Sequence, residues 1–249
     1  MTTSQTTRDP DRLDPLVRES VPWLPHPFSL IWRDGALCHW PVDPDRLRPH
    51  VPDRFTLETF DGQAWLTVVP FVLARAGIRG TPAPLRTTRP VLSLRTPTRY
   101  RDIPGLYHFS VDVGASPTGP TLGRLLGFPC NEAHQRVGGT DDRTDFASQR
   151  HGGRGGRFAA SYRPVDSVSW AAPESLAHWL TERRRLFVPA GRRTLLVELG
   201  HEPWPLRPAS ITITENDLFE AAGLPTPRDG PIAHCCDRLE MTASIPRVV

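Results

Sequence analysis

Prolines divide this chain into short segments: there are 28 of them, spread along 249 residues. A proline inside a helix removes a hydrogen bond and clashes with the preceding turn, so long uninterrupted helices are not expected. Many of the intervening runs are rich in β-branched and aromatic residues, which is typical of strands. The predicted strands are Phe28–Trp32, Ala36–Trp40, Phe55–Phe60, Gln63–Phe71, Val91–Arg99, Leu106–Val113, Phe128–Val137, Gly156–Arg163, Thr194–His201, Ala209–Thr214 and Ile232–Met241.

Helix signals are fewer than strand signals. Asp43–His50 has Asp43 as a candidate N-cap and a proline in the first helical position. Pro173–Arg185 begins with proline and ends with three arginines, which suits the helix dipole. Shorter helices are predicted at Thr121–Leu126 and Glu215–Ala222. Because strands and helices do not alternate as in parallel βαβ units, the predicted fold class is α+β: a largely antiparallel β cone or barrel flanked by a few short helices.

The domain organisation is predicted from the distribution of apolar residues. Residues 1–20 are polar, with mixed Asp and Arg, and are expected to form a flexible arm rather than a signal peptide or membrane anchor. Residues 21–249 are expected to form a single domain, in which Gly138–Gly155 is a surface loop. The four cysteines show no CxxC pair and no disulfide framework. We therefore expect a cytoplasmic protein with reduced thiols and no membrane contact.

The sequence contains no lysine, so all thirty of its Lys-plus-Arg residues are arginines. Codon bias in a GC-rich genome is an ordinary cause, since arginine readily replaces lysine on protein surfaces. The absence nevertheless excludes a Schiff base on a lysine side chain, a lysine-anchored pyridoxal phosphate and a P-loop lysine. Each of these cations is instead a planar, permanently charged guanidinium, which is suited to holding carboxylates.

The net charge of +3 is low for a nucleic-acid-binding protein of this size. One segment, Arg150–Arg157, alternates arginine with glycine, as RNA-contacting segments do. It is short and has no aromatic residues between its arginines, so a solvated loop is the favoured interpretation. Nucleic-acid binding is therefore not expected, and RNA contact through this loop is the weaker alternative.

Two predicted strands place polar side chains together by their period of two. These side chains are His108, Ser110 and Asp112 on the first strand, and Cys130, Glu132 and His134 on the second. The thiol, carboxyl and imidazole of the second strand could serve as nucleophile, acid–base group and orienting group, with Asn131 on the opposite face. The alternative is an exposed sheet edge, where such side chains are simply solvated.

Histidines and cysteines also occur next to each other, at Cys38-His39 and in residues 234–236. Adjacent residues of a strand point to opposite faces, which makes them poor ligands for one ion. The spacings that are standard for zinc sites do not occur in the sequence. We therefore expect no metal site, and we predict no cofactor.

Longer motifs in a fixed order resemble the YqjF-like (DUF2071) family, over about residues 22–240. The motifs are Ala36–Pro49, Phe60–Phe71, Leu94–Thr96, Gly105–Asp112, His178–Arg183 and His201–Leu206. That family is related in fold to acetoacetate decarboxylase, whose β-rich cone holds a buried site for small oxo acids. The resemblance therefore implies an acetoacetate decarboxylase-like cone with a site for a small-molecule substrate or ligand.

The resemblance also implies a change of chemistry. Arg33 lies in a segment that resembles the one supplying an arginine to the decarboxylase site. Gly123–Pro129 resembles the segment before the catalytic lysine pair, but Cys130 and Asn131 follow it here. The Schiff-base lysine and the lysine that lowers its pKa are both replaced. The scaffold is therefore expected without the decarboxylase mechanism.

These observations predict an enzyme that acts on a small carbonyl or carboxylate metabolite by acid–base chemistry. Such a step could be a lyase, dehydration, cyclisation or isomerisation reaction of specialised metabolism. Residues predicted to bind substrate are Arg33, Arg95, His108 and His39, and residues predicted to be catalytic are Glu132, His134, Cys130 and Asn131. The alternative is a non-catalytic small-molecule-binding protein on the same scaffold. Relatives in the wider superfamily assemble, so a homo-oligomer is also expected.

In the predicted mechanism, the two arginines hold a carboxylate or enolate in bidentate fashion. Glu132 or His134 moves a proton next to the carbonyl, and Asn131 or His108 donates a hydrogen bond to the developing oxyanion. A variant uses Cys130 as a covalent nucleophile, although buried cysteines are usually inert.

Overall fold

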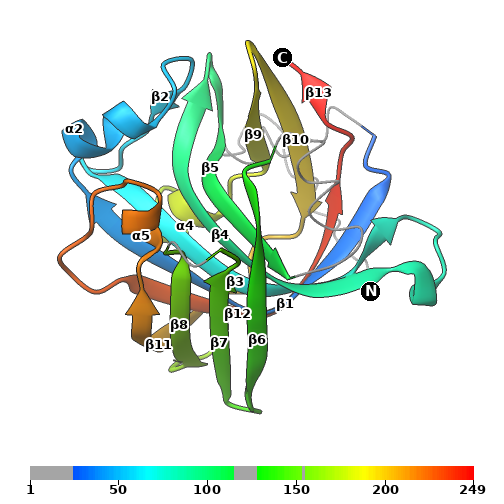
Figure 1. Ribbon diagram of the computed structural model, residues 1–249. Helices are drawn as coiled ribbons and strands as arrows, with labels where there is room; N and C mark the ends of the chain where they lie inside the picture. The colour runs from blue at the N-terminus through cyan, green and yellow to red at the C-terminus, as the bar shows by residue number, and fades with distance from the viewer. Residues whose placement is uncertain (1–24, 115–127, 153–154) are drawn as a thin grey trace, which may run out of the picture.

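The computed structural model describes residues 25–114, 128–152 and 155–249. Its strands form one large sheet (Figure 1). The strands are β1 Phe28–Val42, β2 Thr56–Leu57, β3 Ala64–Ile78, β4 Thr87–Tyr100, β5 Ile103–Gly114, β6 Cys130–Thr140, β7 Arg143–Arg150, β8 Arg157–Pro164, β9 Arg185–Ala190, β10 Arg193–His201, β11 Arg207–Asn216, β12 Ile232–Ala243 and β13 Arg247–Val248. The short helices are α2 Pro44–Leu47, η2 Arg48–His50, η3 Ala83–Leu85, α4 Leu176–Thr181 and α5 Leu218–Ala221.

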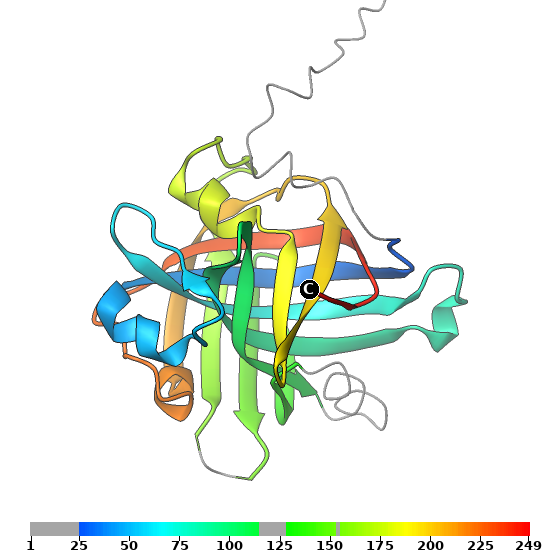
Figure 2. The same cartoon turned by 90° about the horizontal axis from the view of Figure 1, so that it is seen from above.

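The sheet closes on itself. Strands β5, β6, β7, β8, β11, β12, β1, β3 and β4 pair in that order, and β4 pairs back with β5. Strands β9 and β10 bridge the ring, because β9 pairs with β5 and β10 pairs with β12 (Figures 1 and 2). The described pairings are antiparallel except β5–β6 and β5–β9. The predicted α+β class, with a largely antiparallel ring-like sheet and a few short helices, is confirmed.

The central strands β1, β3 and β4 have two buried faces. One face carries Cys38, Leu66 and Leu94, which pack with Phe146 and Phe158 of β7 and β8 in the main apolar core. The opposite face lies toward β9 and β10, which stand on the other side of these strands in Figure 1. Because successive strand residues alternate between faces, the neighbours of the core residues project toward this second side. That second face positions the candidate site.

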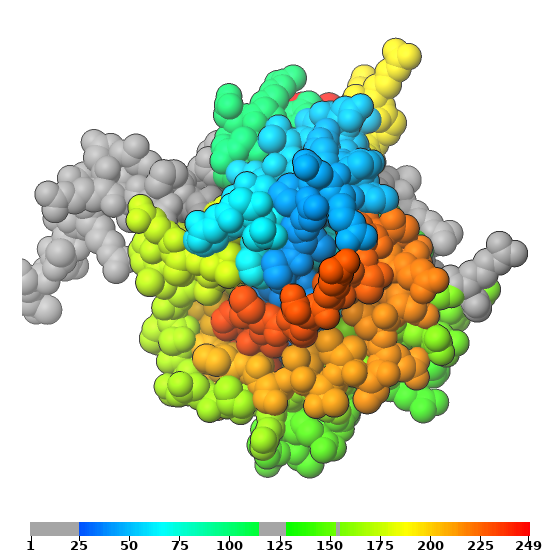
Figure 3. All heavy atoms as spheres, turned by 90° about the vertical axis from the view of Figure 1, so that its left-hand side faces the viewer, coloured from blue at the N-terminus to red at the C-terminus, as the bar shows by residue number. Residues whose placement is uncertain are grey.

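Two helical segments cover one end of the main core. The Asp43 side chain accepts a hydrogen bond from the Asp45 backbone N–H and begins α2, as its predicted N-cap role requires. Leu47 of α2 and Phe219 of α5 are both buried in the core, and Phe219 contacts the Trp40 ring edge-on at 5.2 Å. Figure 3 shows the α2 segment, in blue, beside the α5-to-β12 segment, in orange to red, on this face.

The prediction of a surface loop over Gly138–Gly155 is wrong. Strands β6 and β7 form a hairpin there, with Thr140 paired to Arg143 at its tip. The glycines that suggested a loop serve the hairpin. Gly139 has φ of 134°, and a Cβ at this position would lie 2.0 Å from the Arg143 carbonyl oxygen. Only glycine tolerates both that conformation and that close approach.

The predicted helix at Pro173–Arg185 is shorter than expected. It covers only α4, where Ser175 is the N-cap and the chain leaves the helix at Glu182. The arginines beyond it serve tertiary contacts, since Arg184 donates to the His201 carbonyl and Arg185 begins β9. The predicted arm at residues 1–20 and helix Thr121–Leu126 lie outside the described residues. No helix in the described ranges is long and apolar enough to cross a membrane.

Candidate functional site

Four polar residues lie opposite one another on the adjacent strands β1, β3, β4 and β5. In the strand register, His39 pairs with Thr67, Thr67 with Arg95, and Arg95 with His108. Their exposed fractions are only 0%, 2%, 8% and 6% in that order along the row. Directly opposite residues of paired strands share a face. His39, Thr67, Arg95 and His108 therefore form one buried line, called the polar row below.

Arg95 is the charged member of the polar row. In the described part of the chain, no carboxylate or hydrogen-bond acceptor contacts its guanidinium, and its Nε is buried without a partner. Burial lowers the pKa of Arg95 to about 10, so it still carries its charge at neutral pH. Arginine is almost never fully buried unless it is paired. Among the described residues, its buried Nε–H is therefore free to donate to an anion.

Three imidazoles surround Arg95 closely enough to feel its charge. Burial, with Arg95 as a further cause, lowers the pKa of His108 to about 3. Burial, followed by the charges of Arg184 and Arg95, lowers the pKa of His201 on β10 to about 4. Burial also holds the pKa of His39 well below its ordinary value, helped by His234, whose ring lies 6.0 Å away, and by Arg95. The site therefore places neutral imidazoles beside the Arg95 guanidinium, with Arg184 as a second cation near His201.

The hydrogen bond that one ring nitrogen makes decides whether the other nitrogen can donate to a ligand or accept from it. The Nδ1 of His201 lies 2.8 Å from the carbonyl oxygen of Glu202. A carbonyl only accepts, so Nδ1 carries the proton and the buried Nε2 has a free lone pair. The indole N–H groups of Trp65 and Trp204 are also buried without partners in the described ranges. Native proteins satisfy nearly all such groups with protein atoms, ordered water or a ligand.

Aromatic and aliphatic side chains border the polar row. Leu37 and Val69, two positions along β1 and β3 from His39 and Thr67, belong to a second apolar cluster. In that cluster Trp32 stacks on Phe71 at 4.2 Å and meets Trp204 edge-on at 4.8 Å. Apolar walls with a few convergent polar groups are typical of small-molecule sites.

The structure brings together His39, Arg95 and His108 of the predicted substrate-binding residues. It does not bring Arg33 to them. The Arg33 side chain is 51% exposed and pairs with Asp34 at 3.2 Å. Asp34 has φ of 50°, and the β1–β3 register shifts between Arg33 and Cys38. Arg33 therefore lies outside the buried face, and its role in substrate binding stays a prediction.

The predicted catalytic residues lie on β6, whose first residue Cys130 pairs with Val111 of β5. Asn131 donates to Asp112 Oδ1 at 2.9 Å, which directs it toward the ring interior. Cys130, Glu132 and His134 alternate with it; the first two are half-buried and His134 is exposed. Their predicted sharing of a face follows the strand period. Their roles stay predictions.

The predicted common face of His108, Ser110 and Asp112 is also corrected. The β4–β5 register shifts between Leu94 and Arg95, so His108 joins the polar row while the other two do not. Arg150 donates from Nε to Asp112 at 2.9 Å and from Nη2 to Ser110 at 2.7 Å. A shift of one residue reverses the face of every side chain beyond it.

The arginine–glycine segment is engaged within the protein. Arg150 is bound to Asp112, and Arg157 forms ion pairs with Asp217 at 3.1 Å and Glu215 at 3.6 Å. These internal carboxylates neutralise charges that RNA phosphates require, which weakens the RNA alternative. No set of three or more metal-ligating side chains is gathered within the described residues.

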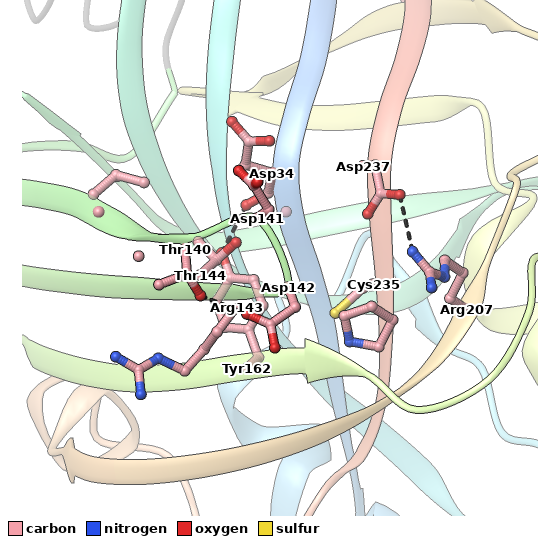
Figure 4. Close-up of a pocket in the computed structure, with 15 residues that line it drawn as sticks. Asp34, Thr140, Asp141, Asp142, Arg143, Thr144, Tyr162, Arg207, Cys235 and Asp237 are labelled. Carbon is pink, nitrogen blue, oxygen red and sulfur yellow. Dashed lines mark hydrogen bonds and ion pairs between the residues drawn. The ribbon is translucent and has the colours of Figure 1, made fainter.

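A cavity of about 620 Å³ lies at the tip of the β6–β7 hairpin (Figure 4). Asp34, Asp142 and Asp237 contribute carboxylates to its lining, and Asp237 is paired with Arg207 at 3.3 Å. Another lining residue, Cys235, packs in the main apolar core. The described residues that line this cavity do not include those of the polar row, so the two sites are distinct.

Sequence reasoning missed Thr67 and His201. Alternation along β3 could have indicated that Thr67 interrupts a buried face shared with Trp65, Val69 and Phe71. The sequence indicated His201 only as part of a motif, because it does not show that β10 pairs with β12 across the ring. Both residues depend on contacts between distant strands.

Comparisons with known proteins agree with this fold. The uncharacterized protein YqjF of Bacillus subtilis (strain 168) is 35% identical over 206 residues, covering 82% of this chain and 84% of that protein. The enduracididine biosynthesis enzyme MppR, solved with the condensation product of pyruvate and imidazole 4-carboxaldehyde, has a TM-score of 0.64 at 16% identity, covering 90% of this chain and 89% of that one. Acetoacetate decarboxylase from Legionella pneumophila has a TM-score of 0.57 at 14% identity, covering 100% and 98% of the two chains.

Both solved structures are of enzymes, and the likeness shows that this chain shares their fold. The sequence profile of DUF2071, described as an uncharacterized conserved protein, matches residues 30–240, which is most of the chain. That match and the identity to YqjF agree with the resemblance found in the motifs. This chain belongs to the DUF2071 family.

Proposed function

We propose that this protein is an enzyme that binds a small carbonyl or carboxylate metabolite at the polar row and moves a proton on it. The observation that carries the proposal is the buried guanidinium of Arg95, whose Nε has no hydrogen-bond partner in the described residues. Burying an unpaired charge costs folding free energy on the order of several kcal/mol. A bound anion offsets this cost. The guanidinium fork matches a carboxylate in shape and charge.

The proposed chemistry uses imidazoles and no imine. The free Nε2 lone pair of His201 accepts a proton from the carbon next to the carbonyl. Charge that develops on the carbonyl oxygen is stabilised by Arg95 and by neutral donors such as His108. A lyase, dehydration, cyclisation or isomerisation step can begin from this enolate. The solved complex of MppR with pyruvate supports a small oxo acid as the ligand class.

A second candidate function is binding without catalysis. The low pKa of His201, about 4, makes it a weak base at neutral pH, which favours this alternative. The two functions differ in the fate of the ligand, because a binding protein returns it chemically unaltered. A cytoplasmic location and assembly into a homo-oligomer stay predictions under either function.

Hydrogen–deuterium exchange on pyruvate tests the proposal. In D₂O, the protein is expected to catalyse loss of the pyruvate methyl proton signal in ¹H NMR. H201Q is expected to slow this exchange about a hundredfold, the usual contribution of a general base. H134Q tests the competing prediction for β6 and is expected to exchange at the wild-type rate. Binding of pyruvate without exchange supports the binding protein, and neither binding nor exchange contradicts both functions for this ligand.

A further inference from the structure

His39 and Thr67 form a buried pair inside the polar row. The Nδ1 of His39 lies 3.0 Å from the Oγ1 of Thr67, and both residues are at most 2% exposed. The other ring nitrogen, Nε2, is buried and has no partner among the described residues. The pair therefore has one internal hydrogen bond, and its direction decides what Nε2 presents.

The two possible directions leave different groups unpaired. If Nδ1–H donates to Thr67, the hydroxyl proton lacks any acceptor in the described chain, and the Nε2 lone pair lacks a donor. If the Thr67 hydroxyl donates to Nδ1, an Nε2–H and the lone pairs of the Thr67 oxygen remain unpaired in the described chain. Each buried unpaired group costs free energy. Both arrangements leave one donor and one acceptor unpaired, but only the second gives Nε2 a proton that an anion held by Arg95 can accept, and this favours it.

We propose that Thr67 is a positioning residue: its hydroxyl donates to His39 Nδ1 and holds the neutral ring in the Nε2–H tautomer. His39 then presents a fixed hydrogen-bond donor to the anion that Arg95 attracts. The inference rests on the proposed function, because it assigns His39 a role toward the same ligand. The two imidazoles then have different hydrogen-bonding roles at Nε2. The Thr67 hydroxyl makes His39 Nε2 a donor, and the Glu202 carbonyl makes His201 Nε2 an acceptor.

Nitrogen NMR of histidine-labelled protein at neutral pH reads this tautomer directly. The His39 signal is identified by its loss in H39Q. Wild type and T67S, which keeps the hydroxyl, are expected to show a protonated Nε2 and an unprotonated Nδ1. T67V, which keeps the side-chain volume and removes the hydroxyl, is expected to show a mixture of tautomers. A protonated Nδ1 in the wild-type protein overturns the proposal, whether or not T67V folds.

Affinity for pyruvate supplies the second readout. T67V is expected to bind pyruvate about fivefold to tenfold more weakly than wild type, the effect of losing one oriented hydrogen bond. T67S is expected to bind within about twofold of wild type. If T67V folds and binds as wild type does, Thr67 has no positioning role.

The two proposals fail in different ways. Wild-type binding of pyruvate that is lost in R95M but kept in T67V leaves the proposed function in place and overturns the role of Thr67. A protonated Nε2 in a protein that binds no pyruvate supports the positioning of the ring and contradicts the pyruvate-class ligand. The NMR measurement requires no ligand, so it decides the tautomer in every case.

Discussion

Replacing Arg95 with methionine is expected to lower affinity for pyruvate by about a hundredfold or more. Truncating one partner of a buried charge pair costs about 2–5 kcal/mol, and about 1.4 kcal/mol corresponds to a factor of ten. The unliganded R95M protein is expected to be at least as stable as wild type, because Arg95 is buried without a partner in the described residues. Titration calorimetry and urea unfolding measure the two effects.

R33M is the matched control, because Arg33 is exposed and pairs only with its neighbour Asp34 among described residues. It is expected to bind pyruvate as wild type does. Loss of binding in R33M with full binding in R95M contradicts the assignment and restores the prediction made from the resemblance. A large loss of stability in R95M shows instead that Arg95 supports the fold through contacts unrelated to a ligand.

Mild acid is expected to destabilise the protein strongly through its buried histidines. The folded pKa of His108 is about 3 and that of His201 about 4, against an ordinary value of 6.5. The unfolded chain therefore binds more protons than the folded chain below pH 6.5, and stability falls as the pH falls. Each ring contributes about 2 kcal/mol of loss between pH 7 and 5, so the two contribute about 4 kcal/mol together.

Urea unfolding at pH 7 and pH 5 measures this loss. H108Q removes one titrating ring and is expected to reduce the pH-dependent loss by about 2 kcal/mol. H134Q, which changes an exposed ring, is expected to leave the loss unchanged. Equal pH dependence in wild type and H108Q means that His108 titrates normally and is not held neutral beside Arg95.

Local patterns in the sequence predicted most strands correctly. Proline spacing and period-two alternation identified the central strands, because both act within a few residues. The hairpin of β6 and β7 was missed, since its glycines and charges are the same residues that a loop uses. The fold class followed from the number and order of strands, and it is confirmed by the closed, largely antiparallel sheet.

The candidate site was predictable only in its parts. His39, Arg95 and His108 were each named from the sequence, but their alignment depends on the register of four strands. Register is set by turns, bulges and packing that one sequence does not specify. The β1–β3 register shifts just after Arg33, and the Arg33 side chain lies outside the buried face. For the same reason Thr67 was not expected beside His39.

The central claim is that the polar row is an anion site. A crystal structure of the wild-type protein soaked with pyruvate tests it most directly. The account predicts a carboxylate on the Arg95 guanidinium, within hydrogen-bond distance of His39 or His108. Pyruvate bound at Arg33 or in the cavity of Figure 4, with the polar row empty, would contradict it.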